Sequence, residues 1–575
     1  MPPTSTDTPT NPASGADATP AKPHSSIKET VISLVIAFVV AFVFRGFVLE
    51  PFMIPTGSMA PTLMGAHLRF DDKHSGYDWA VNPWKFVGNT QTPQPRQGTA
   101  MEPVVVHDPM SGREGRDVDI PTRSGDRIFV LKSVYSFFDP SRFDVVVFKY
   151  PGPTAGEAPG SQNNYIKRLV ALPGEQVAFI DGDVFTRRPT DDQKKETNAW
   201  AGEGWRIARK PERVQRAVWQ PMFDSQYTPW DAQQGKGQFT PPWKGTTSGW
   251  NFGEPGKANA HYRFDAATPT ALEWTNRPIT DWTAYNEWYQ VANYPVPPGP
   301  VVKMGTGVAH LICFPVSDIR ARCTLTPDAD ALTMSALLLA RGHEFRADLS
   351  GGQAILRMRP APSKDNADPA WKDLASVDLP ETALKPGRAT AVEFWHVDQT
   401  LSLWIDGGRI VEAGYDWSPA ERVLASTGIS VDDALAEENK TRGQWPLYAP
   451  ARYRQASFRF EFSGSKFTIH RSALDRDLHY QPRQRPDNVY GLGTHPEACA
   501  ILTADQFVFC GDNSAASADS RLWTDVDPFT ASQIDDTVGV VHRDLLVGRA
   551  FCVYFPAPKP GSIPIPDAGR LRFIW

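Results

Sequence analysis

The chain has 575 residues, more than one domain usually needs, so at least two domains are expected. A net charge of −6 gives no sign of the basic surface that nucleic-acid binding requires. Apolar residues make up 41 %, which is enough for ordinary cores, and the 52 prolines and 18 tryptophans favour a loop-rich β protein over a helical one.

The first 49 residues divide into a polar tail and an apolar segment. Residues 1–26 are rich in Pro, Thr, Ser and Ala, and we expect them to be disordered because they cannot bury a core. Residues 27–49 are predicted to form one transmembrane helix, since the apolar run within them would reach ~28 Å at ~1.5 Å per residue. Lys22, Lys28 and Arg45 at its two ends favour an inside N-terminus. A cleaved signal sequence and a buried core helix are the alternatives.

A serine follows this segment on a tight, glycine-containing turn. The run Pro-Thr-Gly-Ser-Met-Ala-Pro-Thr-Leu, residues 55–63, presents Ser58 as a candidate nucleophile. The G-x-S-x-G elbow is absent, and no His and Asp are spaced as a Ser-His-Asp triad would suggest. The general base must therefore be a residue of another type.

Lys167 is the best candidate for that base. It lies in Asn-Tyr-Ile-Lys-Arg-Leu-Val-Ala-Leu-Pro-Gly-Glu, residues 164–175, an apolar strand-like run that would strip water from its ammonium group. Burial lowers a lysine pKa from its usual ~10.4, and a neutral amine can take the proton of a serine hydroxyl. Taken singly, such a turn and such a lysine usually have structural roles only. Together they predict a Ser-Lys dyad.

The order of these segments resembles bacterial type I signal peptidase, the leader peptidase family that uses a Ser-Lys dyad. The resemblance also rests on the segments 124–130, 139–151, 511–521 and 547–551, of which 511–521 reads Gly-Asp-Asn-Ser-Ala-Ala-Ser-Ala-Asp-Ser-Arg. It extends over 27–185 and 488–556, with nothing matched between them.

The resemblance implies roles for individual residues. Ser58 would be the nucleophile, Lys167 the general base, and Ser517 would hydrogen-bond and orient the lysine amine. The Thr56 hydroxyl and the Ser58 backbone N–H would form the oxyanion hole. Shallow apolar pockets for the small side chains before the cut, commonly alanine, would be lined by Phe52, Ile54, Met59 and Ile166. Supporting ion pairs would join Arg168 to Asp512 and Asp519 to Arg521.

Two positions depart from the family pattern. The family usually continues from Gly-Asp-Asn with Arg-Asp-Asn, whereas this chain has Ser-Ala-Ala at 514–516, which changes the electrostatics of that loop. Phe143 stands where a glycine is usual. Neither position is a proposed catalytic group, so the resemblance still implies activity.

The implied fold is mainly β, with a signal-peptidase-like antiparallel core that follows the N-terminal helix. Its first part is expected at 50–190, with a smaller insertion at 66–123, and its second part at 488–575. Residues 191–487 are too long for a loop and predict an inserted β-rich domain. A hairpin pattern at 401–411 is similar to the hairpins of concanavalin-like jelly rolls and favours a β-sandwich.

Fourteen tryptophans lie inside the insertion, and two explanations are open. Aromatic faces could stack on the sugar rings of a glycan or cell-wall ligand, yet tryptophan is also a routine core residue of β-sandwiches. The two ends of the insertion are expected to lie close together on the core. Replacing 192–486 by a short linker should then preserve the active site.

No cofactor is expected. The five cysteines form no C-x-x-C pair, which argues against a metal site, and no Walker loop, nucleotide fingerprint or H-E-x-x-H motif occurs. Cys313 and Cys323 are close enough in sequence for a small disulfide loop, or they are buried free thiols.

These observations predict a serine endopeptidase that removes N-terminal signal peptides from exported preproteins. It would be a single-pass protein of the bacterial inner membrane, with the lipid bilayer as a second partner and the catalytic domain on the extracytoplasmic side. One alternative is a catalytically decayed, membrane-tethered protein that displays a glycan-binding β-sandwich. Another is a self-cleaving repressor-type Ser-Lys protease, but such proteins are soluble and carry a DNA-binding module where this chain has an apolar span.

Overall fold

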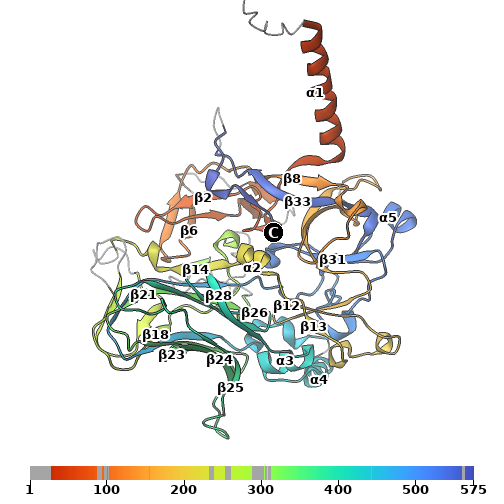
Figure 1. The fold of residues 1–575 in the computed structure, drawn as a ribbon. Helices are drawn as coiled ribbons and strands as arrows, with labels where there is room; N and C mark the ends of the chain where they lie inside the picture. The colour runs from red at the N-terminus through yellow and green to blue at the C-terminus, as the bar shows by residue number, and fades with distance from the viewer. Residues whose placement is uncertain are drawn as a thin grey trace, which may run out of the picture. The chain divides into compact units, whose positions relative to one another are not determined.

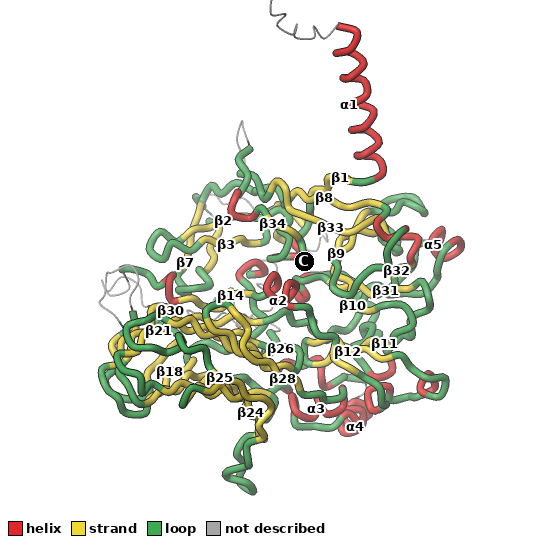
Figure 2. The backbone as a smooth tube through the Cα atoms, viewed as in Figure 1, coloured by secondary structure: helices red, strands yellow, loops and turns green. Residues whose placement is uncertain are grey.

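The computed structural model describes residues 27–86, 93–95, 100–101, 103–154, 156–231, 239–252, 261–287, 303–304, 307–308, 313–441, 443–559 and 564–575. The chain forms two compact units, one ending at Glu50 and one running from Pro51 to Trp575 (Figure 1). Strands make up most of the regular structure of the second unit, in agreement with the predicted mainly β fold (Figure 2).

The regular element of the first unit is helix α1 (Ile27–Phe47), close to the helix expected over 27–49. Its apolar side chains are exposed, for example 46 % at Ile32 and 71 % at Phe42. A search of the helices within the described residues found none long and apolar enough to cross a membrane. The transmembrane prediction is therefore not confirmed.

One sheet of the second unit combines strands from both expected parts of the core. Its order is β1-β8-β33-β9-β10-β31-β32, with β34 paired to β33. Strand β10 runs antiparallel to β9 and to β31, with Lys167 opposite Val146 and Arg168 opposite Cys510. The strands are β1 (Leu49–Met53), β8 (Arg127–Lys132), β9 (Val145–Lys149), β10 (Asn164–Ala171), β31 (Gln506–Cys510), β32 (Val541–His542), β33 (Leu546–Phe555) and β34 (Arg572–Phe573).

Two larger sheets of the insertion share one apolar core, which is the arrangement of a β-sandwich. The first runs β16 (Trp250–Asn251), β17 (Tyr262–Phe264), β30 (Phe467–Arg476), β21 (Ile319–Pro327), β26 (Thr390–Val397), β27 (Thr400–Ile405) and β28 (Gly408–Gly414), with β14 (Gln220–Asp224) beside β30. The second runs β15 (Trp243–Gly245), β18 (Thr270–Trp274), β29 (Ser457–Ser463), β22 (Thr333–Ala340), β23 (His343–Ser350), β24 (Gln353–Pro360) and β25 (Lys372–Asp378).

Side-chain alternation explains how these strands form the core. In β29, Phe458, Phe460 and Phe462 are buried, while the residues between them are partly exposed. The hairpin predicted at 401–411 is confirmed as β27 and β28. Eight of the insertion's tryptophans are also buried, which supports their explanation as core residues, and they are Trp200, Trp205, Trp219, Trp243, Trp274, Trp395, Trp404 and Trp445.

Shorter elements complete the second unit. The smaller insertion folds into hairpins, with β2 (Leu68–Asp71) on β3 (Asp78–Val81), β4 (Trp84–Phe86) on β5 (Pro93–Pro95) and β6 (Val104–His107) on β7 (Glu114–Asp117). A further pair is β19 (Lys303–Met304) and β20 (Gly307–Val308). The helices are α2 (Glu212–Val218), α3 (Pro419–Thr427), α4 (Val431–Thr441) and α5 (Pro528–Gln533). Helix α3 begins with a capping box between Ser418 and Glu421 and ends at Gly428, whose φ is 84°.

The larger insertion is joined to the core by buried ion pairs. The core hairpin β11 (Gln176–Ile180) and β12 (Asp183–Arg187) continues into β13 (Arg206–Ile207) of the insertion. In the hairpin turn, Asp181 Oδ2 accepts hydrogen bonds from Arg341 Nε at 2.7 Å and from Arg422 Nε at 3.0 Å. All three side chains are buried. The insertion and the core therefore share one interior.

Candidate active site

Ser58 lies on a short 3-10 turn, Gly57–Met59, which follows β1. The Ala60 N–H closes this turn by donating to the Gly57 carbonyl oxygen at 3.0 Å. Only glycine fits at position 57, because a Cβ there would lie 2.2 Å from the Tyr285 hydroxyl oxygen. The turn is packed tightly on that side, and Ser58 itself is half-buried.

Lys167 reaches Ser58 from strand β10. Its Nζ donates a hydrogen bond to Ser58 Oγ at 2.7 Å and a second to the Ile166 carbonyl oxygen at 3.1 Å. Only 4 % of Lys167 is exposed. The two residues that the sequence proposes as base and nucleophile are therefore in direct contact inside the protein.

The surroundings of Lys167 favour its neutral form. Burial lowers the pKa of the Lys167 amine from its usual value to about 8, against the opposing effects of Asp519, Asp512 and Cys510. Both carboxylates are also paired with arginines, which limits how strongly they hold the proton on the amine. About a tenth of the amine is therefore unprotonated at pH 7, and this fraction, which the general base requires, rises with pH.

Two hydrogen-bond donors lie where the oxyanion hole is expected. Thr56 precedes the turn with an extended backbone (φ −119°, ψ 158°) and an exposed side chain that does not cap the turn. Over the described ranges, the Ser58 backbone N–H donates no hydrogen bond. Both groups are thus available to a substrate carbonyl, and their role stays a prediction.

Ser517 lies beside the nucleophile turn but is not hydrogen-bonded to the lysine. A Cβ on Gly511 would lie 2.2 Å from Ser517 Oγ and 2.4 Å from the Ser58 carbonyl oxygen, so both flank the same glycine. Ser517 is 1 % exposed, and its hydroxyl has no hydrogen-bond partner of standard geometry in the part of the chain described. The pKa of the Asp519 carboxyl is lowered from its usual value. Burial raises this pKa, but Arg521 and the nearby Ser517 hydroxyl are among the groups that lower it. The expected orienting bond to Lys167 is absent from this arrangement.

Both expected ion pairs are present and fully buried. Arg168 binds Asp512 through two parallel hydrogen bonds, Nε to Oδ1 at 2.8 Å and Nη2 to Oδ2 at 2.6 Å. Arg521 binds Asp519 in the same way at 2.9 Å and 2.8 Å. Asp519 Oδ2 also accepts the Gly511 N–H at 2.9 Å. The pairs thereby fix the loop that lies beside the Ser58 carbonyl.

Phe143, one of the two departures, adopts a backbone conformation that explains why the family usually has glycine there. Its φ is 71°, in the left-handed region that glycine tolerates best. Its carbonyl oxygen accepts from Arg168 Nη1 at 2.9 Å, so the unusual backbone helps to hold that buried guanidinium. The ring is 2 % exposed and packs in a core cluster with Val214 and Val218 of the insertion.

The other departure, the Ser-Ala-Ala loop, has its own partners. Ser514 Oγ accepts from Arg521 Nη1 at 2.8 Å and from the Gln481 backbone N–H at 2.8 Å. Arg483 Nη1 donates to the Ala515 carbonyl oxygen at 3.2 Å. A hydroxyl and a neighbouring arginine therefore stabilise this loop where the family usually has charged residues.

The four apolar residues expected to line the substrate pockets belong to one cluster. Ile54 and Met59 are buried, at 3 % and 0 % exposure, while Phe52 and Ile166 pack against the cluster and are partly exposed. Ile574 of the C-terminal segment lies in the same cluster. Phe52 and Ile166 therefore keep exposed apolar surface, whereas Ile54 and Met59 are core residues, and the expected pocket role of the four stays a prediction.

Two asparagines that the sequence analysis did not single out hold the nucleophile turn. Asn513 Nδ2 donates to the Gly57 carbonyl oxygen at 2.9 Å, and the Asn513 backbone N–H donates to the Ser58 carbonyl oxygen at 3.1 Å. Asn286, from the insertion, is hydrogen-bonded to the Asn513 side chain. Asn513 lies inside a family-like segment and could have been noticed, but nothing in the sequence around Asn286 points to this site.

The cysteines and the acidic residues form no second catalytic centre in the described residues. Cys313 and Cys323 are buried free thiols, so the disulfide considered for them is not formed. Four buried carboxylates bring oxygens within 4.8 Å of one another, namely Asp183, Asp318, Asp398 and Asp477. Lys210 Nζ lies 2.5 Å from Asp398 Oδ1 and 2.8 Å from Asp477 Oδ2, so basic side chains are built into this cluster.

Comparison with known proteins identifies a family whose model matches part of the chain. Residues 27–202 match the family model described as signal peptidase, peptidase S26. Signal peptidase I of Rickettsia typhi is 26 % identical over 184 residues, which are 32 % of this chain and 51 % of that protein. Probable signal peptidase I-1 of Synechocystis sp. is 26 % identical over 163 residues, 28 % of this chain and 53 % of that protein. The chain spans about half the length of the curated relatives it matches.

Solved structures show weaker likenesses. The carbohydrate-binding module CBM66 from Bacillus subtilis aligns with a TM-score of 0.21 at 8 % identity, covering 41 % of this chain and 95 % of that one. The VIP36 exoplasmic/lumenal domain aligns with a TM-score of 0.22 at 7 % identity, covering 42 % and 86 %. Scores this low support no argument about fold or ligand. The match over residues 27–202, which contain Ser58 and Lys167, confirms the predicted resemblance to the signal peptidases of peptidase family S26.

Proposed function

We propose that this protein is a Ser-Lys endopeptidase that removes signal peptides from exported preproteins. The observation that carries the proposal is the 2.7 Å contact between Lys167 Nζ and Ser58 Oγ in a buried setting that lowers the lysine pKa to about 8. A solvated lysine would remain protonated and could not serve as the base. The match to a peptidase family over residues 27–202 supports the same chemistry.

The reaction would proceed through an acyl-enzyme. The neutral Lys167 amine takes the proton of Ser58 Oγ as the oxygen attacks the carbonyl carbon at the cleavage site. The Thr56 hydroxyl and the Ser58 N–H stabilise the negative oxygen that forms, and Lys167 then gives its proton to the departing amine. A water molecule, activated by the same lysine, hydrolyses the ester and frees Ser58 for another cycle.

Attachment to the bilayer is a further part of the proposal. Helix α1 exposes a row of apolar side chains that water solvates poorly, including Leu34, Phe38 and Phe42. A lipid bilayer would cover these side chains. It would also bring the enzyme together with substrates that are held in the same membrane by their own apolar segments. Deleting residues 27–47 should release the protein from membranes washed with carbonate at high pH, and retention of the shortened protein there would contradict the attachment.

Replacing the dyad tests the catalytic proposal directly. Ser58→Ala and Lys167→Ala should each abolish cleavage of a preprotein with alanine before the cut, while circular dichroism shows an unchanged fold. Lys167→Arg should fail as well, because guanidinium stays protonated. The exposed Lys194→Ala is the matched control and should cleave normally.

The same assay separates the proposal from the alternative of a decayed binding protein. An unmodified protein that turns over no preprotein, in detergent or in vesicles, would favour that alternative. A Lys167→Ala variant that cleaves at the normal rate would show that another base operates.

A further inference from the structure

A cavity of about 390 Å³ lies next to the nucleophile turn. Pro61 and Met64, which follow that turn, line one part of it. Most of the remaining lining comes from the two insertions, chiefly residues 69–80 and 277–285, and Arg570 comes from the C-terminal part of the core. A cavity of this size accommodates a small organic molecule. Residues 277–285 lie outside the part of the chain that matches the signal peptidase family model.

The walls of the cavity are rich in aromatic side chains. Tyr77, Trp79, Trp282 and Tyr285 all line it. The rings of Tyr77 and Trp79 are stacked, with centroids 6.5 Å apart and an angle of 11° between their planes. Trp79 and Tyr285 are buried. Such a surface favours a ligand with an apolar or aromatic body.

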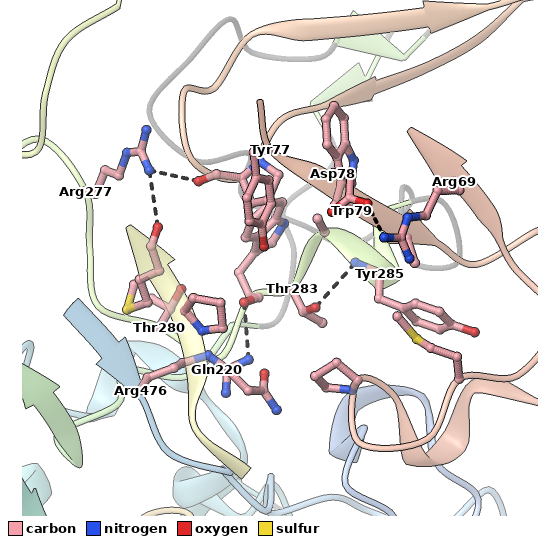
Figure 3. Close-up of a pocket in the computed structure, with 18 of the residues that line it drawn as sticks. Arg69, Tyr77, Asp78, Trp79, Gln220, Arg277, Thr280, Thr283, Tyr285 and Arg476 are labelled. Atoms are coloured by element: carbon pink, nitrogen blue, oxygen red, sulfur yellow. Dashed lines mark hydrogen bonds and ion pairs between the residues drawn. The ribbon is translucent and has the colours of Figure 1, made fainter. Parts of the chain in front are cut away.

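The arginine side chains that line the cavity indicate which polar group a ligand would carry beside its apolar body. Arg69 and Arg570 line the cavity but are neutralised, since Arg69 pairs with Asp567 at 2.9 Å and Arg570 with Asp126 at 2.8 Å. Within the described residues, Arg277 has no carboxylate at ion-pair distance. In this part of the chain it donates only to main-chain carbonyl oxygens, of Pro109 at 2.9 Å, Met110 at 2.5 Å and Met222 at 3.4 Å. Figure 3 shows Arg277 at the cavity, with dashed lines for its bonds to lining residues.

This pattern leaves Arg277 as a positive charge in an apolar place. Burial lowers the pKa of its guanidinium to about 10, with only Asp108 opposing the effect. The group has five N–H donors, more than its three carbonyl contacts use. An anion near it would restore the lost solvation and form charge-assisted hydrogen bonds.

We propose that this cavity binds a small ligand with an anionic head, a carboxylate or a phosphate, and an apolar or aromatic body. The head pairs with Arg277, and the body packs against Trp79 and Trp282. The site neither contains Ser58 or Lys167 nor depends on peptidase activity, so its test is a binding measurement.

Calorimetric titration of the full-length protein with probes that share one body tests the head preference. The probes are 4-phenylbutyrate, 4-phenylbutyl phosphate, 4-phenylbutanol and 4-phenylbutylamine, with inorganic phosphate alone as the headgroup control. At least one of the two anions should bind about tenfold or more tightly than the alcohol, and the amine should bind most weakly. The stronger anion identifies the head, and inorganic phosphate should bind more weakly than either because it lacks the body.

Matched variants test the place. Arg277→Met should reduce the affinity of both anions to that of the alcohol, and Arg277→Lys should retain part of the preference. Arg188→Met, at an exposed arginine, should change nothing. Arg277 also donates to three main-chain carbonyl oxygens, so Arg277→Met could change the local structure as well as remove the charge. Thr280→Trp is therefore a second test: it fills the cavity and should abolish binding of every probe.

Three results would overturn the proposal. They are equal affinity of the unmodified protein for acid, alcohol and amine, no binding of any probe at millimolar concentration, and binding that survives both Arg277→Met and Thr280→Trp. The peptidase assay reports separately on Ser58 and Lys167, so failure of one proposal leaves the other standing.

Discussion

The side chains of Asn286 and Asn513 exchange two hydrogen bonds. Asn286 Nδ2 donates to Asn513 Oδ1 at 2.6 Å, and Asn513 Nδ2 donates to Asn286 Oδ1 at 2.8 Å. Both residues are buried, and Asn513 also binds the carbonyl oxygens of Gly57 and Ser58. A residue of the insertion is therefore only one side chain away from the nucleophile's backbone.

Removing this contact should slow catalysis more than it weakens substrate binding. Asn286→Ala leaves Asn513 with unpaired polar atoms in a buried place and loosens the turn that aims Ser58 Oγ, so kcat should fall by about tenfold or more with KM little changed. Steady-state cleavage of a short peptide measures both constants. Asn163→Ala, at an exposed asparagine, is the control, and an unchanged kcat in Asn286→Ala would show that the turn is held without it.

The activity should depend on pH through Lys167. Its pKa is lowered to about 8, so the neutral, active amine increases as pH rises and the protonated, inactive form dominates below that value. The rate of acylation should therefore fall by about tenfold for each pH unit below this pKa and level off above it. Single-turnover rates between pH 5.5 and ~9.5 provide the measurement, and a flat profile over that range would exclude this lysine as the titrating base.

The Arg168–Asp512 pair should matter for stability. Both side chains are fully buried, so Arg168→Met would leave an uncompensated carboxylate in the interior and should cost about 3–5 kcal/mol. A lower urea midpoint of unfolding would show it. Arg116→Met breaks the exposed pair with Glu114 and should cost less than about 1 kcal/mol. Similar effects of the two substitutions would mean that the buried pair relaxes or is hydrated.

The insertion should not be removable without loss of activity. The sequence predicts that a linker in place of 192–486 preserves the site, but the structure shows Tyr285 against Gly57 and Asn286 against Asn513. It also shows Asp181 of the core paired with Arg341 and Arg422 of the insertion. We therefore expect the deletion variant to be insoluble or inactive.

A single substitution separates the two possible causes of that loss, namely lower stability and a disturbed nucleophile turn. Arg422→Met weakens the attachment to the core hairpin without touching the nucleophile turn. It should lower stability while retaining most of the peptidase activity at low temperature. A soluble deletion variant with normal peptide cleavage would restore the original expectation of separable parts.

The sequence was sufficient for contacts that belong to local, family-like segments. Ser58 and Lys167 could be paired because each lies in such a segment, and the strand-turn-strand pattern at 401–411 predicted a hairpin that the structure contains. The same information could not reveal Asn286 or Tyr285. Their role depends on how the insertion folds back onto the turn, which no pattern near them encodes.

Other expectations failed for different physical reasons. The family resemblance implied that Met59 lines a substrate pocket, yet its side chain is completely buried. Ser517 was expected to hydrogen-bond the Lys167 amine. Whether that bond forms depends on the side-chain rotamer of Ser517, which the sequence does not specify. Cys313 and Cys323 are near in sequence, which allowed a small disulfide loop, but both are free thiols. Cys323 lies on β21, where its side chain is part of the sandwich core.

Phe143 has a consequence for any attempt to return this chain to a minimal enzyme. A ring replaces the usual glycine at a φ of 71°, a substitution that strains the backbone by about 1–3 kcal/mol, while burial of the ring is worth about 3–5 kcal/mol. Lys210 of the insertion lies 6.0 Å from the ring centre, and Val214 and Val218 share its cluster. The favourable contribution thus depends partly on the insertion, because the same cluster also contains core residues such as Val170 and Phe179, whereas the strain does not depend on it. A shortened protein would keep the strain and lose part of the favourable contribution, so trimming the insertion and restoring glycine at position 143 belong to one engineering step.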